Sequence, residues 1–173
     1  MVNLITGTQG SGKTSFLLGY VRSRVAEGRS VGGVAAPAVF SEERREGYDV
    51  IDLASGQRRT LCRVGTPGEG ALAVGPYVFD PATLAAGNAA IVEAIRGGLD
   101  VIAIDEIGPL EFRGSGWAPS LATALEECTT SQELLVAVRP SLVDRLPGQF
   151  PSSRWSAATT LAPPWPGIEG GRC

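Results

Sequence analysis

The chain has 173 residues, of which 43% are hydrophobic and 19% are charged, and its formal net charge is -3. This length and composition predict a single globular domain with a sizeable core and exclude a disordered tail protein. Because the balance is acidic and no block of basic residues occurs, we do not expect nucleic acid to be a partner.

Residue types that are absent or isolated exclude several kinds of site. The chain has no histidine, which excludes histidine-based triads and histidine-ligated metals. Cys62, Cys128 and Cys173 are far apart and lack C-x-x-C spacing, which argues against a disulfide framework and a thiolate zinc site. The start has no basic segment before a long apolar one, and no run approaches the roughly 18 apolar residues of a spanning helix. We therefore expect a cytoplasmic protein without a membrane partner.

The first residues predict a strand, a loop and a helix. Residues 2–6, VNLIT, are a short apolar run rich in β-branched residues, which favours a strand. Leu17, Val21 and Val25 follow about one helical turn apart, and Gly28 is placed to end that helix. Residues 31–37, VGGVAAP, predict a second strand.

The loop between the first strand and helix is GTQGSGKT, residues 7–14, which fits G-x-x-x-x-G-K-[ST] at every fixed position. Its glycines let the backbone wrap a phosphate, and its amides and the helix start supply donors and positive partial charge. Lys13, the only lysine of the chain, can reach between the β- and γ-phosphates, and Thr14 can ligate Mg²⁺. The predicted phosphate-binding residues are Gly7, Thr8, Gln9, Gly10, Ser11, Gly12, Lys13, Thr14 and Ser15.

A β-hairpin is predicted at about residues 44–64, because GYDVIDL and RTLCRV alternate apolar and polar residues around ASGQR. Arg44, Arg45, Arg58 and Arg59 flank it. They have two interpretations: a lid over an acceptor pocket, or the solvated charges that exposed strand edges often carry.

Helices and strands alternate through the rest of the chain. Asp80 and Pro81 predict a helix start, which Leu84, Ile91 and Ile95 continue to the glycines at 97–98. Residues 99–105, LDVIAID, predict a strand buried on both faces. A helix at 117–128, a strand at 133–138, a short helix at 140–146 and a last strand within 154–161 follow. We therefore predict one α/β domain, residues 1–161, with a mainly parallel sheet flanked by helices and an inserted hairpin; the Pro/Gly-rich residues 162–173 are expected to be poorly ordered.

Two adjacent carboxylates end the buried strand. Asp105 is placed to hold the hydration shell of Mg²⁺, and Glu106 to polarise an attacking water, so both are predicted site residues. The alternative is a pair of solvated charges that open a turn. For Glu111 the sequence leaves open a supporting role behind the site or an exposed carboxylate at a helix entry.

Arg139 follows the strand at 133–138, at the sheet edge where such folds bind their ligands. One interpretation is a catalytic arginine that stabilises the charge growing on the γ-phosphate. The other is a surface ion pair with a carboxylate such as Asp144.

The loop at 7–14, the element DEIGPLE at 105–111 and the stretches GYDVIDLASGQRRTLCRVG and VGPYVFD together resemble a known family. It is the small nucleoside-triphosphatase family named from thermophiles, which includes the cancer-related nucleoside-triphosphatase. The resemblance covers about residues 1–146. It implies a RecA-like P-loop fold and slow, Mg²⁺-dependent hydrolysis of nucleoside triphosphates, including ATP and GTP, with loose base selectivity. It also implies that residues 7–14 cradle the phosphates and that Asp105 and Glu106 take the metal and water roles.

The chain departs from the family pattern in two places. Pro109 stands where members commonly carry a lysine, and residues from 146 onward match poorly, which leaves base recognition open. Two other functions remain as alternatives: a nucleotide-binding accessory protein like the adaptors of molybdenum-cofactor assembly, and a small-molecule kinase. Glu106 argues against the first, and the second needs an acceptor pocket. The sequence names no protein partner.

Overall fold

A computed structural model describes residues 1–165. Its strands form one continuous sheet, in which five parallel strands are ordered β10, β1, β9, β8, β2. The bounds of these parallel strands are β1 Val2–Thr6, β2 Val31–Ala35, β8 Val101–Ile107, β9 Glu133–Val138 and β10 Thr159–Leu161. The carboxyl ends of β1, β8 and β9 therefore meet at one edge of the sheet, which is where an α/β fold binds its ligand.

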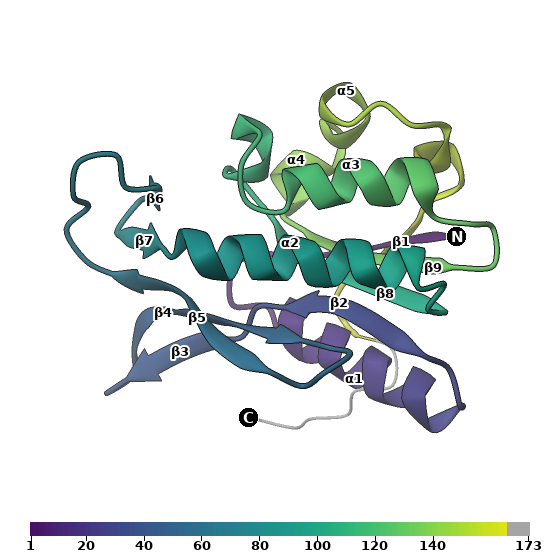
Figure 1. The fold of residues 1–173 in the computed structure, drawn as a ribbon, viewed down its shortest axis with the longest axis horizontal. Coiled ribbons are helices and arrows are strands. Elements are labelled where there is room, and N and C mark those ends of the chain that lie inside the picture. Colours follow the sequence, from purple (N-terminus) through teal and green to yellow (C-terminus); the bar gives the residue numbers. More distant parts are fainter. Residues whose placement is uncertain (166–173) are drawn as a thin grey trace.

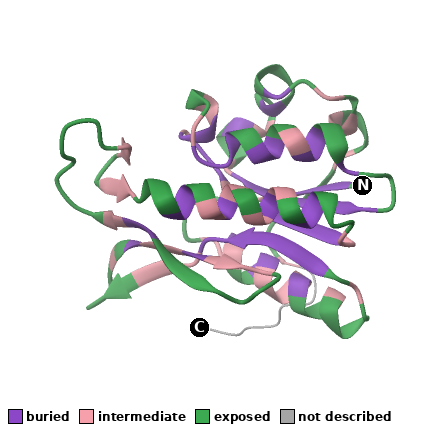
Figure 2. Ribbon diagram, viewed as in Figure 1, coloured by how far each residue is buried: buried purple, intermediate pink, exposed green. Residues whose placement is uncertain are grey.

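Helices cover both faces of the parallel strands (Figure 1). Helix α1 (Lys13–Ala26) packs on one face, and α2 (Pro81–Arg96) and α3 (Ala118–Glu127) pack on the other. Successive residues of β8 serve the two cores in turn, since Ile102 and Ile104 join the core under α2 and α3 while Ala103 joins the core under α1. A strand buried on both faces has to be apolar throughout, which explains the run VIAI and the buried centre in Figure 2.

The capping signals act as the sequence predicts. Asp80 accepts a hydrogen bond from the Ala82 N–H at the start of α2, and Pro81 occupies the first turn, where its missing N–H costs nothing. Gly97 ends the helix.

The predicted hairpin exists as β4 (Arg44–Asp52) and β5 (Arg58–Val64), but it belongs to a larger unit. Strand β4 pairs with β2, so the hairpin continues the main sheet in antiparallel fashion. Three short strands that the sequence did not predict complete this antiparallel extension: β3 (Ala38–Ser41), β6 (Ala73–Val74) and β7 (Tyr77–Phe79).

The C-terminal third departs most from the prediction. The expected helix at 140–146 is split into α4 (Pro140–Val143) and α5 (Leu146–Gln149), and η1 (Glu111–Arg113) precedes α3. Residues 153–157 form the 3-10 helix η2 (Ser153–Ala157), so only the end of the expected 154–161 strand is extended, as β10. Within the tail expected to be poorly ordered, Trp165 packs on Phe16 of α1, and residues 166–173 lie outside the described residues. No helix within residues 1–165 is long and apolar enough to span a bilayer.

Candidate active site at the carboxyl ends of the parallel strands

The loop between β1 and α1 has the backbone of a phosphate cradle. Gly10 and Gly12 have φ angles of 80° and 86°, which residues with a Cβ rarely adopt. A Cβ at Gly7 would lie 2.3 Å from Ser11 Oγ, so the loop closes tightly on itself. No side chain caps the start of α1, which leaves its first amides to an anion.

Lys13 lies inside this loop and is buried. Its Nζ donates to the carbonyl oxygens of Gly7 at 2.8 Å and Thr8 at 3.2 Å, and lies 3.9 Å from Glu106 Oε2. The ammonium is thus held between the loop and the Glu106 carboxylate near the end of β8. Of the other predicted loop residues, Thr14 is half-buried, whereas Thr8, Gln9 and Ser15 are exposed.

Asp105 is fully buried near the end of β8. Its Oδ2 accepts the Ala36 N–H at 3.0 Å, whereas Oδ1 is buried without a hydrogen-bond partner in the described structure. Burial raises the pKa of Asp105 to about 6, and the neighbouring Glu106 charge adds to the rise, while the Ala36 N–H, the Thr14 hydroxyl and Lys13 lower the pKa. The interpretation of Asp105 as a solvated turn charge is therefore wrong.

The oxygen donors here fit Mg²⁺ better than any metal that needs a protein cage. Within residues 1–165 no group of three or more Cys, Asp or Glu side chains is gathered to hold a metal. Mg²⁺ is commonly held by one or two protein oxygens, with phosphates and water completing its shell. An unpartnered Asp105 oxygen beside Thr14 fits that requirement.

Glu106 and Arg139 form a pair at the mouth of the site. Arg139 Nε donates to Glu106 Oε1 at 2.9 Å, and both side chains keep contact with solvent, at 40% and 26% exposure. One interpretation of the sequence paired Arg139 with a surface carboxylate such as Asp144. In the structure Arg139 pairs instead with Glu106, which lies 33 residues away in the chain. The Glu106 carboxylate thus lies between Lys13 and Arg139.

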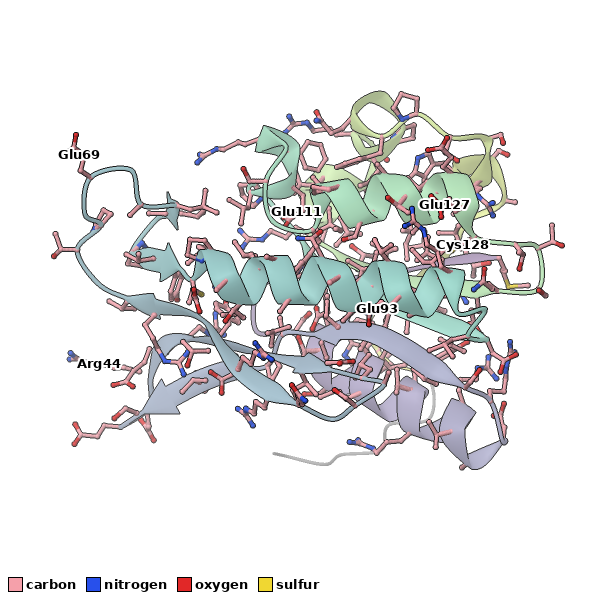
Figure 3. All side chains as sticks on the ribbon, in the orientation of Figure 1. Arg44, Glu69, Glu93, Glu111, Glu127 and Cys128 are labelled. Carbon is pink, nitrogen blue, oxygen red and sulfur yellow. The ribbon has the colours of Figure 1, made fainter. Side chains whose placement is uncertain are left out.

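Glu111 is buried, not exposed as one interpretation had it. Its carboxylate accepts the Gly108 N–H at 2.8 Å and the Trp117 N–H at 3.0 Å, so it ties the DEIG turn to the start of α3. Glu111 is labelled in Figure 3. Trp117 Nε1 in turn donates to the Asp105 backbone oxygen. Burial raises the pKa of Glu111 to about 7 despite these two N–H donors.

The four arginines that flank the hairpin, Arg44, Arg45, Arg58 and Arg59, have different surroundings. Arg58 pairs with Asp49 and Arg59 bonds Gln57, and both are exposed, as is Arg44, which points away from the molecule in Figure 3. Arg45 alone among the four approaches the phosphate loop. It donates to the Tyr48 hydroxyl at 3.1 Å, and that hydroxyl accepts the Gln9 amide at 3.4 Å.

A pocket with a cavity volume of about 100 Å³ opens beside the Glu106–Arg139 pair. Strands β4 and β7 contribute Tyr48, Tyr77 and Phe79, and Trp117 forms part of its wall. Sequence reasoning missed these aromatic residues. The resemblance of GYDVIDL and VGPYVFD to one family was the only signal that could have pointed to them.

Three comparisons with known proteins bear on this site. A family profile described as NTPase matches residues 3–149. This chain belongs to the NTPase family. Among its relatives is the nucleoside-triphosphatase THEP1 of Pyrobaculum aerophilum, 38% identical over 143 residues, which are 81% of this chain and 75% of the relative. THEP1 of Methanothermobacter thermautotrophicus is 36% identical over 137 residues, 78% of this chain and 73% of the relative.

Solved structures support the same fold. A human cancer-related nucleoside triphosphatase aligns with a TM-score of 0.67 and 25% identity, over 91% of this chain and 85% of that one. THEP1 of Aquifex aeolicus aligns with a TM-score of 0.70 and 21% identity, over 94% and 89%. The predicted fold class, a P-loop α/β domain with a mainly parallel sheet, is confirmed, and so is the family named by resemblance. The accessory-protein and kinase alternatives are not favoured.

Proposed function

We propose that this NTPase-family chain hydrolyses nucleoside 5'-triphosphates to the diphosphate and phosphate, with Mg²⁺ as cofactor. The observation that carries the proposal is the convergence of a P-loop lysine and two strand-end carboxylates, with Lys13 Nζ 3.9 Å from Glu106 Oε2. The names of the relatives, nucleoside-triphosphatase, support the same activity.

The predicted site residues have different roles in phosphate and metal binding. Loop amides and Lys13 would bind the phosphate chain, and Thr14 and Asp105 would hold Mg²⁺, which would neutralise phosphate charge and orient the γ-phosphate. Because Asp105 Oδ1 is buried without a hydrogen-bond partner in the described structure, a cation there would remove the cost of burying that oxygen.

Glu106 is the residue placed to orient the attacking water and accept its proton. In the described structure its carboxylate is shared between Arg139 and Lys13. A γ-phosphate competes for both cations, which frees Glu106 for the water and brings Arg139 to the charge that grows during transfer. We therefore assign Lys13, Glu106 and Arg139 catalytic roles.

Phosphate release with Glu106→Gln tests the proposal. The variant should bind a Mg²⁺-nucleotide about as tightly as the parent and lose on the order of 10²-fold or more in turnover, the usual worth of a positioned base. The parent is measured with ATP, GTP, CTP and UTP, with and without Mg²⁺. Arg58→Ala, which removes an exposed ion pair of the hairpin, is the control and should keep its rate. A parent that releases no phosphate from any triphosphate would contradict the proposed function.

A further inference from the structure

The strand order fixes the direction in which a bound nucleotide must extend. Strand β1, which leads into the phosphate loop, has β9 on one side and β10 on the other. Arg139 follows β9, and Asp105 and Glu106 lie near the carboxyl end of β8 beyond it, so the γ-phosphate belongs on that side. The loop amides hold the α- and β-phosphates while the lysine reaches the β- and γ-phosphates. The nucleoside therefore leaves the loop on the β10 side.

An aromatic side chain occupies that side. Trp165 follows β10 by four residues, and its Nε1 donates to the Ser11 backbone oxygen at 2.9 Å. Its ring stacks on Phe16, in the first turn of α1, with centroids 4.7 Å apart and planes 21° apart. The indole is half-buried and packs with Leu161 against the core under α1.

From these contacts we infer that Trp165 forms the nucleobase subsite, as a stacking platform for the base of the bound nucleoside triphosphate. The inference rests on the proposed function and adds to it a residue that lies outside the family match at 3–149. Stacking on an aromatic face is available to every base, because each has a π-face.

The hydrogen bond that the indole N–H donates determines how well this subsite can distinguish one nucleobase from another. The indole N–H is a donor only, and it is already used on the Ser11 oxygen. Because one face of the ring is stacked on Phe16, the opposite face would be the flat surface for the base, with no free donor to read the base edge. Purines and pyrimidines are both accepted, and the larger purine rings bind somewhat more tightly because they overlap more of the indole.

Matched ligands with and without a nucleoside separate this role from support of the loop. Binding of ADP, GDP and inorganic pyrophosphate, each with Mg²⁺, is measured by calorimetry for the parent, Trp165→Ala and Trp165→Phe. We expect Trp165→Ala to weaken ADP and GDP about tenfold, as loss of one base stack does, and to change pyrophosphate less than twofold. Trp165→Phe should recover most of the affinity, since it keeps an aromatic face.

Several outcomes would overturn the inference. An equal loss for ADP and pyrophosphate in Trp165→Ala means that the indole only supports the loop. Tighter ADP binding in that variant means that the indole blocks the base position. A parent that binds ADP no better than pyrophosphate, yet hydrolyses ATP, leaves the proposed function intact and removes the base subsite. A parent that binds none of the three ligands and releases no phosphate from any triphosphate refutes the proposed function itself.

A fluorescence readout makes the test independent of affinity. ADP should quench tryptophan emission in the parent while pyrophosphate does not, and the ADP signal should vanish in Trp165→Phe. Trp155→Phe, whose indole bonds Phe150 far from the loop in sequence, is the matched control and should keep the quenching. Quenching that survives in Trp165→Phe would overturn the inference.

Discussion

At the scale of the residue, Arg139 holds Glu106 at 2.9 Å and lies where a γ-phosphate would arrive. We predict that Arg139→Ala lowers kcat at least about tenfold with little change in nucleotide Kd, because its contact with the phosphate strengthens in the transition state. Single-turnover hydrolysis beside titration with a non-hydrolysable triphosphate measures the two quantities. An unaltered single-turnover rate with a slightly lower melting temperature would make Arg139 a structural residue.

Glu111 gives a prediction about pH. The pKa of its carboxyl is raised from an ordinary 4.5 to about 7, so the folded state binds the proton more tightly than the unfolded chain does. Its contribution to the free energy of unfolding is therefore fully present below about pH 4.5 and is lost as the pH rises through about 7. Asp105, with a pKa raised to about 6, acts in the same direction.

We predict that Glu111→Gln reduces this pH dependence, because the amide does not titrate. Urea unfolding of both proteins between pH 4.5 and 8 measures it. The slope of stability against pH should be shallower in the variant than in the parent. Equal slopes would show that Glu111 does not carry the effect.

At the scale of the element, the contact between α2 and α3 depends on a glycine. A Cβ at Gly87 of α2 would lie 2.6 Å from the Trp117 ring, which bonds the Asp105 backbone oxygen. Alanine gains up to about 1 kcal/mol of helix propensity, whereas overpacking costs about 1–3 kcal/mol.

We predict that Gly87→Ala lowers the free energy of unfolding by about 1 kcal/mol, the balance of those two effects, and also lowers turnover. Urea unfolding and phosphate release measure the two effects. Gly148→Ala in α5, where an added Cβ meets nothing within 4 Å, is the control and should not destabilise. A Gly87→Ala protein more stable than its parent would show that the Trp117 ring moves aside freely.

The sequence predicted those elements whose signals are local. The P-loop, the run VIAI before Asp105 and the Asp80–Pro81 cap each encode their own geometry, so β1, α1, β8 and α2 lie where expected. Strands β6 and β7 have two and three residues and exist only through pairing with β5 and with each other, which no local pattern records. Propensity was likewise overridden at residues 153–157, where Trp155 donates its indole N–H to Phe150.

The same distinction holds within the site. Lys13, Asp105 and Glu106 belong to two contiguous motifs and were predicted. Tyr48 and Trp165 were not, since they reach the loop from 39 residues beyond Gln9 and 154 residues beyond Ser11. Contacts over such separations are set by the topology of the whole sheet.

At the scale of the whole molecule, nucleotide binding should raise the melting temperature of the protein. A ligand at about 100 times its Kd adds about 2.7 kcal/mol to a one-site protein, which for this size is a rise of roughly 5–10 °C in melting temperature. We predict such a rise with Mg²⁺ and ADP in excess, and none in Lys13→Ala, which should remain folded by circular dichroism. An equal rise in the Lys13→Ala protein would place the nucleotide outside the phosphate loop.

The lengths of the edge strands bear on whether molecules of this protein associate through their sheets. The strand order runs from β10, with three residues, to β6, with two, and β3, with four residues, pairs among the described strands only with β4 beside that path. Each border strand thus presents only a few unpaired amides and carbonyls, too short a template for another chain to lengthen the sheet. A crowded solution of this protein should therefore remain free of edge-to-edge association, although the sheet itself is long.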